Sequence, residues 1–95
     1  LENSVFRQLV EKYGKESVRF WRTADKKEVD FVVKQGLKIK QLIQVCYDIS
    51  DQDTKKREIV SLIKASKELK CNNLLIITDD FEGTEKIKNK TIYFC

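Results

Sequence analysis

The sequence predicts a mixed α/β fold with the element order αβββαβ followed by a short terminal strand. Apolar residues recur at helical spacing in two segments, and between and after them they alternate or run continuously over strand lengths. A chain of 95 residues that is 41% apolar can bury one modest core. We therefore expect a single domain over 1–95, built on a mixed central sheet with helices on both faces.

The first half of the chain changes from helical to strand periodicity. Apolar residues recur every three or four positions at its start, and Gly14 provides a helix stop. The segments that follow alternate in polarity, are rich in aromatic and β-branched residues, and are separated by the polar turn 23–27 and by Gly36. These patterns predict a helix over 1–13 and strands over 18–22, 28–34 and 37–47.

The second half predicts a crossover helix and a buried strand. Ser50, Asp51 and Asp53 are each suited to cap a helix whose apolar positions keep a 3.6 period up to about Lys70. The continuous apolar run Leu74–Ile77 is typical of a central strand covered on both faces, parallel to the strand before the helix. The remaining segments predict a short turn or helical segment over Thr84–Asn89 and a last strand over Thr91–Phe94.

Composition excludes several classes of site. The chain has no His, and its three cysteines, Cys46, Cys71 and Cys95, show no C-x-x-C spacing, which removes the usual zinc sites and all histidine-based catalysis. We expect each Cys to be a small buried apolar residue or an incidental surface thiol. No apolar run approaches the roughly 18 residues of a membrane span, so we expect no membrane association and a cytoplasmic location. The first residue is Leu and Met is absent, which indicates a piece of a longer protein.

One carboxylate lies inside an apolar strand. Asp30 stands in Glu28–Val33 among Val and Phe residues. Burial of an unpaired carboxylate costs several kcal/mol, so Asp30 needs a metal ion, a basic partner or open water. Lys34, on the same face of the predicted strand, and Arg57, on the second predicted helix, are the candidate cationic partners.

Five phrases in order along the chain carry a resemblance to a known family. The element order, with an acidic residue at the start of the first helix, resembles the PD-(D/E)XK nuclease superfamily. The phrases are more specifically similar to the C-terminal domain of uncharacterised archaeal and bacterial P-loop ATPases of the AAA type. The resemblance implies a restriction-endonuclease-like domain behind an ATPase module. The phrases are Leu1-Glu2-Asn3, Glu28-Val29-Asp30-Phe31-Val32-Val33, Ile43-Gln44-Val45-Cys46-Tyr47, Thr54 with Arg57-Glu58-Ile59, and Ile76-Ile77-Thr78-Asp79.

The resemblance also implies a site. In active members an Asp on the second strand and a Glu, sometimes a Gln, on the third bind Mg²⁺. A Lys two residues on positions the attacking water, and a Glu of the first helix assists. Carried over, the catalytic positions are Asp30, Gln44 and Cys46, and the metal ligands are Glu2, Asp30 and Gln44. Glu2 is equally explained as an acidic residue in the first turn of a helix, where the helix dipole favours it.

The departures from the family pattern decide the expected function. Gln44 offers an oxygen but no charge, and the Cys46 thiol cannot replace a lysine. We therefore expect a catalytically degenerate accessory domain that binds nucleic acid, a protein partner or its own ATPase module. The alternative is an active Mg²⁺- or Mn²⁺-dependent DNA nuclease with a rearranged site. Mg²⁺ is implied only if the site is active, and with no Gly-rich phosphate loop here, ATP would bind in the missing N-terminal part.

The basic residues leave two interpretations open. Lys26, Lys27, Lys34 and Arg57 are the candidate nucleic-acid-binding residues near the predicted site. The lysines at 38, 40, 86, 88 and 90 could line a phosphate-binding surface, but they are interspersed with acidic residues, and we expect a solvated charged face. A modest net charge of +4 also leaves room for a structural or homo-oligomeric role.

Overall fold

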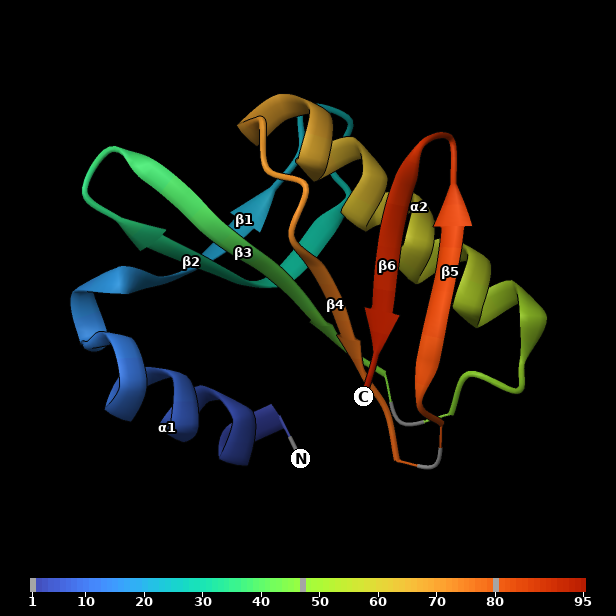
Figure 1. Cartoon of the computed structure of the whole chain (residues 1–95), viewed down its shortest axis with the longest axis horizontal. Helices are drawn as coiled ribbons and strands as arrows, with labels where there is room; N and C mark the ends of the chain where they lie inside the picture. Colours follow the sequence, from blue (N-terminus) through green and yellow to red (C-terminus); the bar gives the residue numbers. More distant parts are fainter. Residues whose placement is uncertain (1, 47, 80) are drawn as a thin grey trace.

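The computed structural model describes residues 2–46, 48–79 and 81–95, with side chains from residue 4 onward. One six-stranded mixed sheet has a helix on each face, and the strand order is β1-β2-β3-β4-β6-β5 (Figure 1). The predicted fold class is confirmed. The elements are α1 (Glu2–Tyr13), a 3₁₀ turn η1 (Lys15–Ser17), β1 (Val18–Arg22), β2 (Glu28–Gln35), β3 (Lys38–Val45), α2 (Gln52–Leu69), β4 (Leu74–Ile77), β5 (Gly83–Ile87) and β6 (Lys90–Phe94).

The sheet joins an antiparallel meander to a parallel half. β1, β2 and β3 pair antiparallel through short turns. β4 pairs parallel to β3, which requires a crossover connection, and α2 provides it. β6 then pairs parallel to β4 and antiparallel to β5. The apolar run of β4 therefore lies between β3 and β6, in the central position that the sequence predicts.

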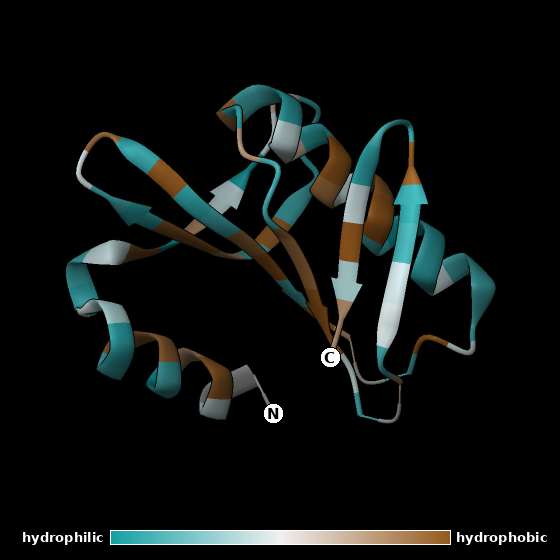
Figure 2. Cartoon of the chain, viewed as in Figure 1, coloured by the Kyte–Doolittle hydropathy of each residue, from teal (hydrophilic) through white to brown (hydrophobic). Residues whose placement is uncertain are grey.

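The sheet separates two apolar clusters. On one face, Leu62 of α2 packs with Leu74 and Ile76 of β4, and all three are fully buried. On the other face, Val5 of α1 packs with Phe31 of β2 and with β3. Apolar residues accordingly line the strands between the two helices (Figure 2). The alternation of side chains along each strand is what divides the apolar residues between the two clusters.

The helix ends follow the local sequence. Gly14, with φ of 94°, ends α1 as predicted, because glycine adopts positive φ without a Cβ clash. Of the three candidate caps for α2, the structure selects Asp51, whose side chain accepts hydrogen bonds from the backbone N–H groups of Asp53 and Thr54. At the other end, Lys70 is the C-cap and has left-handed backbone angles.

Two predicted elements are corrected by the structure. The turn or helical segment predicted over Thr84–Asn89 was wrong, because Gly83–Ile87 form the edge strand β5. β5 is largely exposed, so it lacks the apolar periodicity that announces a strand. The strand predicted over 37–47 is shorter, with Leu37 in the turn and residue 47 outside the described part. No helix in the described ranges is long and apolar enough to cross a membrane.

Candidate functional site

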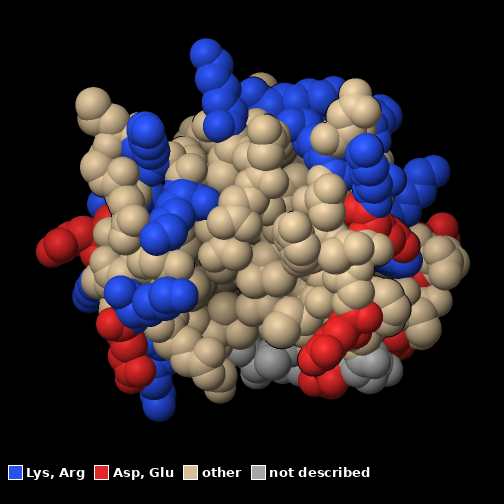
Figure 3. Space-filling view, viewed as in Figure 1, with Lys and Arg blue, Asp and Glu red and all other residues tan. Residues whose placement is uncertain are grey.

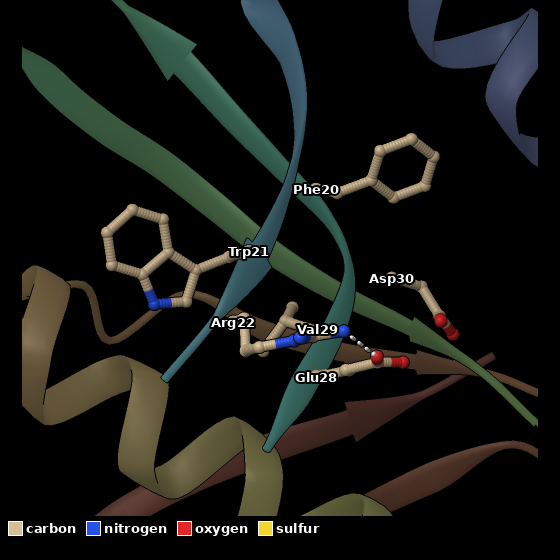
Figure 4. A pocket seen from close by; sticks show the side chains of 6 residues that line it. All are labelled: Phe20, Trp21, Arg22, Glu28, Val29 and Asp30. Atoms are coloured by element: carbon tan, nitrogen blue, oxygen red, sulfur yellow. Dashed lines mark hydrogen bonds and ion pairs between the residues drawn. The ribbon is translucent and has the colours of Figure 1, made fainter. Parts of the chain in front are cut away.

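Asp30 lies at an irregularity of β2. Over one step of the β1–β2 pairing, β1 contributes Phe20 alone where β2 contributes Asp30 and Phe31. Such a β-bulge bends the strand and changes the direction in which its side chains point. Figure 4 shows Asp30 and Phe20 on the same side of the strands, away from Trp21. The bulge takes Asp30 out of the simple alternation that the sequence predicts.

Gln44 fills the place where the regular ladder between β2 and β3 stops. The ladder runs from the Phe31–Ile43 pair toward the hairpin turn. Beyond this pair, Gln44 Oε1 accepts a 2.7 Å hydrogen bond from the backbone N–H of Asp30, and its Nε2 donates a 3.0 Å bond to the carbonyl of Glu28. Gln44 is only 2% exposed. Its amide satisfies one part-buried donor and one part-buried acceptor of the β2 backbone.

The side chain of Asp30 in turn binds the backbone of β3. Its Oδ2 accepts a 2.8 Å hydrogen bond from the backbone N–H of Val45. Two of the predicted catalytic side chains therefore hold the two strands together at the bulge. In doing so they use one carboxylate oxygen of Asp30 and the amide oxygen of Gln44 as hydrogen-bond acceptors for backbone N–H groups.

Cys46 provides no positive charge at the third predicted position. It is 7% exposed, and its thiol donates to the Asp48 carbonyl with an Sγ–O distance of 3.7 Å. Burial first, and then the charge of Glu58, raise the pKa of the Cys46 thiol. The group therefore stays a neutral thiol near pH 7, which is the state that the sequence predicts for it.

Glu58 is the acidic residue that sequence reasoning missed. The sequence assigns no site role to it, whereas in α2 it is half-buried. Burial raises the pKa of Glu58, the charge of Asp30 raises it further, and Arg57 opposes the shift. Glu58 therefore lies within electrostatic reach of both Asp30 and Cys46. The sequence holds one signal for this, because Glu58 is one helical turn before the fully buried Leu62.

The metal-ligand prediction for Glu2, Asp30 and Gln44 stays a prediction, because only two of the three side chains are described. Asp30 and Gln44 are brought together, but they bind backbone groups of each other's strands. Glu2 begins α1, and its side chain lies outside the described part of the chain. Within the described ranges, no group of three or more His, Cys, Asp or Glu residues is arranged to hold a metal ion.

The structure divides the predicted nucleic-acid-binding residues. Lys26, Lys27 and Arg57 line one hollow of about 320 Å³ together with Glu58 and its neighbours. Lys34 does not join them. It is exposed and lies four residues beyond Asp30 along β2, about 13 Å away at the rise of an extended strand.

The turn that carries Lys26 and Lys27 is fastened to α2. Asp25 forms an ion pair with Lys64, and the Ala24 N–H donates a 2.9 Å hydrogen bond to Glu68. The Lys64 ammonium, followed by the hydroxyl of Thr23, lowers the pKa of Asp25 to about 2. These contacts hold the turn against the helix.

A second hollow, of about 460 Å³, opens beside Asp30. Glu28 and Arg22 form a 2.8 Å ion pair in its wall, and Asp30 and Trp21 contribute to the lining (Figure 4). The buried indole Nε1 of Trp21 has no hydrogen-bond partner among the described residues. The hollow is thus mixed in character, with one carboxylate, one ion pair and aromatic side chains.

Comparison with known proteins gives one match. A family described as "Domain of unknown function (DUF4143)" matches residues 1–93. No curated protein and no solved structure matches the chain.

Proposed function

This chain belongs to the DUF4143 family, and from that premise we propose that it is a nuclease-like accessory domain of a P-loop ATPase whose inherited catalytic site has lapsed. In this proposal the domain has a PD-(D/E)XK-type ancestry, and it acts by binding nucleic acid or protein. The observation that carries the proposal is the buried amide of Gln44, which pairs with the backbone of Asp30 and Glu28.

The chemistry of phosphodiester hydrolysis supports this proposal. A Mg²⁺ site needs several free oxygen ligands and negative charge. Gln44 is neutral and its oxygen is already an acceptor for a backbone N–H. A positive group is also needed near the nucleophile or the developing charge, and the Cys46 thiol does not supply it. Both deficits concern residues whose present contacts serve the sheet.

One observation favours a second candidate, an active Mg²⁺- or Mn²⁺-dependent nuclease with a rearranged site. Glu58 lies close enough to Asp30 for the charge of Asp30 to raise its pKa. A second carboxylate on α2 would replace the charge missing at Gln44. Arg57 and the lysines of the neighbouring turn would supply the missing cation.

A cleavage assay separates the two candidates. The whole protein is incubated with linear and circular DNA in Mn²⁺, beside the variants Asp30→Asn and Glu58→Gln. We expect no cleavage above that of the variants. Cleavage by the natural protein that both substitutions abolish would overturn the lapsed site and establish the second candidate. ATP hydrolysis by the whole protein, with a G-x-x-x-x-G-K-[ST] motif in its sequence, tests the ATPase association.

A further inference from the structure

The fold collects lysines from three separate segments at one end of the sheet. β3, β4 and β6 are parallel, so the residues that begin or precede them lie at the same end. These residues are the segments 38–40, 70–73 and 88–90. They contain no acidic and no aromatic residue. We call their five lysines the basic ridge: Lys38, Lys40, Lys70, Lys88 and Lys90.

Hydrogen bonds connect the three segments. The side chain of Asn73 donates a 3.2 Å bond to the carbonyl of Lys40, and Lys90 Nζ donates a 2.8 Å bond to Asn72 Oδ1. Lys40 also lies over the ring of Tyr13, with Nζ 5.1 Å from its centroid. Asn72 and Asn73 thus join the segments of Lys40 and Lys90 at the start of β4.

Charge is sorted across the molecule. The opposite, carboxyl ends of β3 and β4 lead into acidic residues, among them Asp48 and Asp79. Figure 3 shows the largest group of Lys and Arg side chains at the upper right, where β6 begins in Figure 1, and acidic side chains at the lower right and at the left edge. None of the ion pairs between described residues involves a lysine of the basic ridge. Its positive charge is therefore not neutralised by a carboxylate among the described residues.

Two of these lysines occupy backbone positions that suit glycine. Lys70, the C-cap of α2, has φ of 55°, and Lys88, in the β5–β6 turn, has φ of 50°. Glycine reaches this left-handed region without a steric cost, and it is the usual residue at both kinds of position. Lys26, outside the ridge, has the same conformation with φ of 66°, so the backbone at Lys70 and Lys88 fixes where these two exposed side chains lie and is not itself a sign of binding.

We propose that the basic ridge binds the phosphate backbone of a nucleic-acid duplex. Lysines act as point charges toward phosphates without base specificity, and asparagine side chains commonly bond to phosphate oxygens. Single strands are held by stacking of successive bases on aromatic side chains. The ridge segments carry none, and the one ring that contacts the ridge, Tyr13, is half-buried and covered by Lys40. An acidic peptide would need an apolar anchor. Ile39 and Cys71 pack into the core, and the exposed Leu37 beside Lys38 lies at the edge of the ridge, outside any apolar pocket of the three segments.

This inference rests on the binding role proposed above, and it names the partner and the surface. The ridge is separate from the Asp30 position, which lies toward the carboxyl end of β3. Loss of duplex binding would remove the ridge proposal and leave the lapsed catalytic site untouched. DNA cleavage, in contrast, would overturn the lapsed catalytic site and leave the ridge proposal untouched.

The test is the affinity of the whole protein for a short labelled DNA duplex, measured by fluorescence anisotropy over a range of salt concentrations. The ridge variant is Lys38→Gln/Lys70→Gln/Lys88→Gln. The control is Arg7→Gln/Lys15→Gln/Lys56→Gln, which removes the same charge from exposed positions outside the ridge. We expect the Kd of the ridge variant to rise roughly tenfold or more, and its salt slope to fall by about 0.9 for each phosphate that is no longer neutralised.

The control variant should bind within about twofold of the natural protein, since distant exposed charges contribute little at physiological salt. Circular dichroism checks that both variants fold. The proposal is overturned if the natural protein does not bind the duplex, if both variants lose affinity equally, or if polyglutamate competes as well as the duplex. A duplex RNA of equal length shows whether the ridge distinguishes the two backbones.

Discussion

At the level of single residues, Asp30 and Gln44 tie β2 to β3 where the regular ladder ends. The sequence alone shows that Gln44 lacks charge and that Cys46 lacks a cation. It does not show the amide bridge, because the bridge depends on the bulge at Asp30 and Phe31. The pattern of apolar and polar residues over 28–33 does not indicate that β2 has one more residue than β1 at this point. The charge deficit was predictable from the sequence, and the structural role of Gln44 was not.

Replacement of Gln44 by Leu tests this structural role. The change keeps a similar volume but leaves the part-buried Asp30 N–H and Glu28 carbonyl without their partner. Each such loss costs about 1–3 kcal/mol for a buried group. Because these two groups are only part-buried, the free energy of unfolding should fall by about 2–4 kcal/mol, the lower part of the summed range. Urea denaturation measures it. The matched control is Gln41→Leu on the same strand, where the side chain is half-buried, and it should change stability by less than about 1 kcal/mol. A comparable loss in both variants would refute the bridge.

At the level of elements, the strands and helices with strong apolar periodicity were predictable, and β5 was not. β4 was recognised because all four of its residues are apolar. β5 carries Gly, Thr, Glu and Lys before its single Ile, and it pairs with β6 alone. The partner strand decides the conformation of such an edge segment. Glu58 was missed for a related reason, because its burial depends on how α2 packs against the sheet.

The C-terminal end of α2 gives a prediction at this level. Lys70 has φ of 55°, which costs an ordinary residue about 1–2 kcal/mol and glycine little. Substitution by glycine removes this cost, but the greater flexibility of glycine in the unfolded chain offsets part of the stability gained. Lys70→Gly should therefore raise the free energy of unfolding by about 0.5–1 kcal/mol while it weakens duplex binding. Thermal and urea denaturation measure the stability.

The control for this change lies one turn earlier in the same helix. Lys67→Gly also exchanges an exposed lysine for glycine, but inside α2, where glycine should cost about 1 kcal/mol. The two substitutions are thus expected to have opposite signs. If Lys70→Gly lowers the free energy of unfolding, the left-handed conformation of Lys70 does not cost the protein the roughly 1–2 kcal/mol given above.

At the level of the whole molecule, the topology rearranges what the sequence intersperses. Lysines and acidic residues alternate along the chain, which predicts a solvated face of mixed charge. Three parallel strands bring the lysines of distant segments to one end and place Asp48 and Asp79 at the other. This placement of lysines at one end of the strands and acidic residues at the other follows from the parallel direction of the strands. It becomes visible only when the pairing of β3, β4 and β6 is known.

The three cysteines give a prediction for the cooperativity of the whole fold. Cys46 and Cys71 are 7% and 4% exposed and pack in the cluster under α2, whereas Cys95 is exposed. A thiol reagent should label Cys95 at once in the native protein. The two buried thiols should react at least roughly a thousandfold more slowly than Cys95, because labelling requires an opening that costs several kcal/mol. The raised pKa of Cys46 slows its reaction further at neutral pH.

Mass spectrometry of the labelled protein at increasing urea distinguishes local from global opening. Because Cys46 follows β3 and Cys71 precedes β4, both thiols are covered by the same packing of α2 on the central strands. Their labelling rates should therefore rise in parallel with urea, with the slope of the global unfolding transition. If Cys71 were labelled early and without urea dependence, the C-terminal end of α2 would open on its own. The basic ridge would then include a segment that unfolds independently of the sheet.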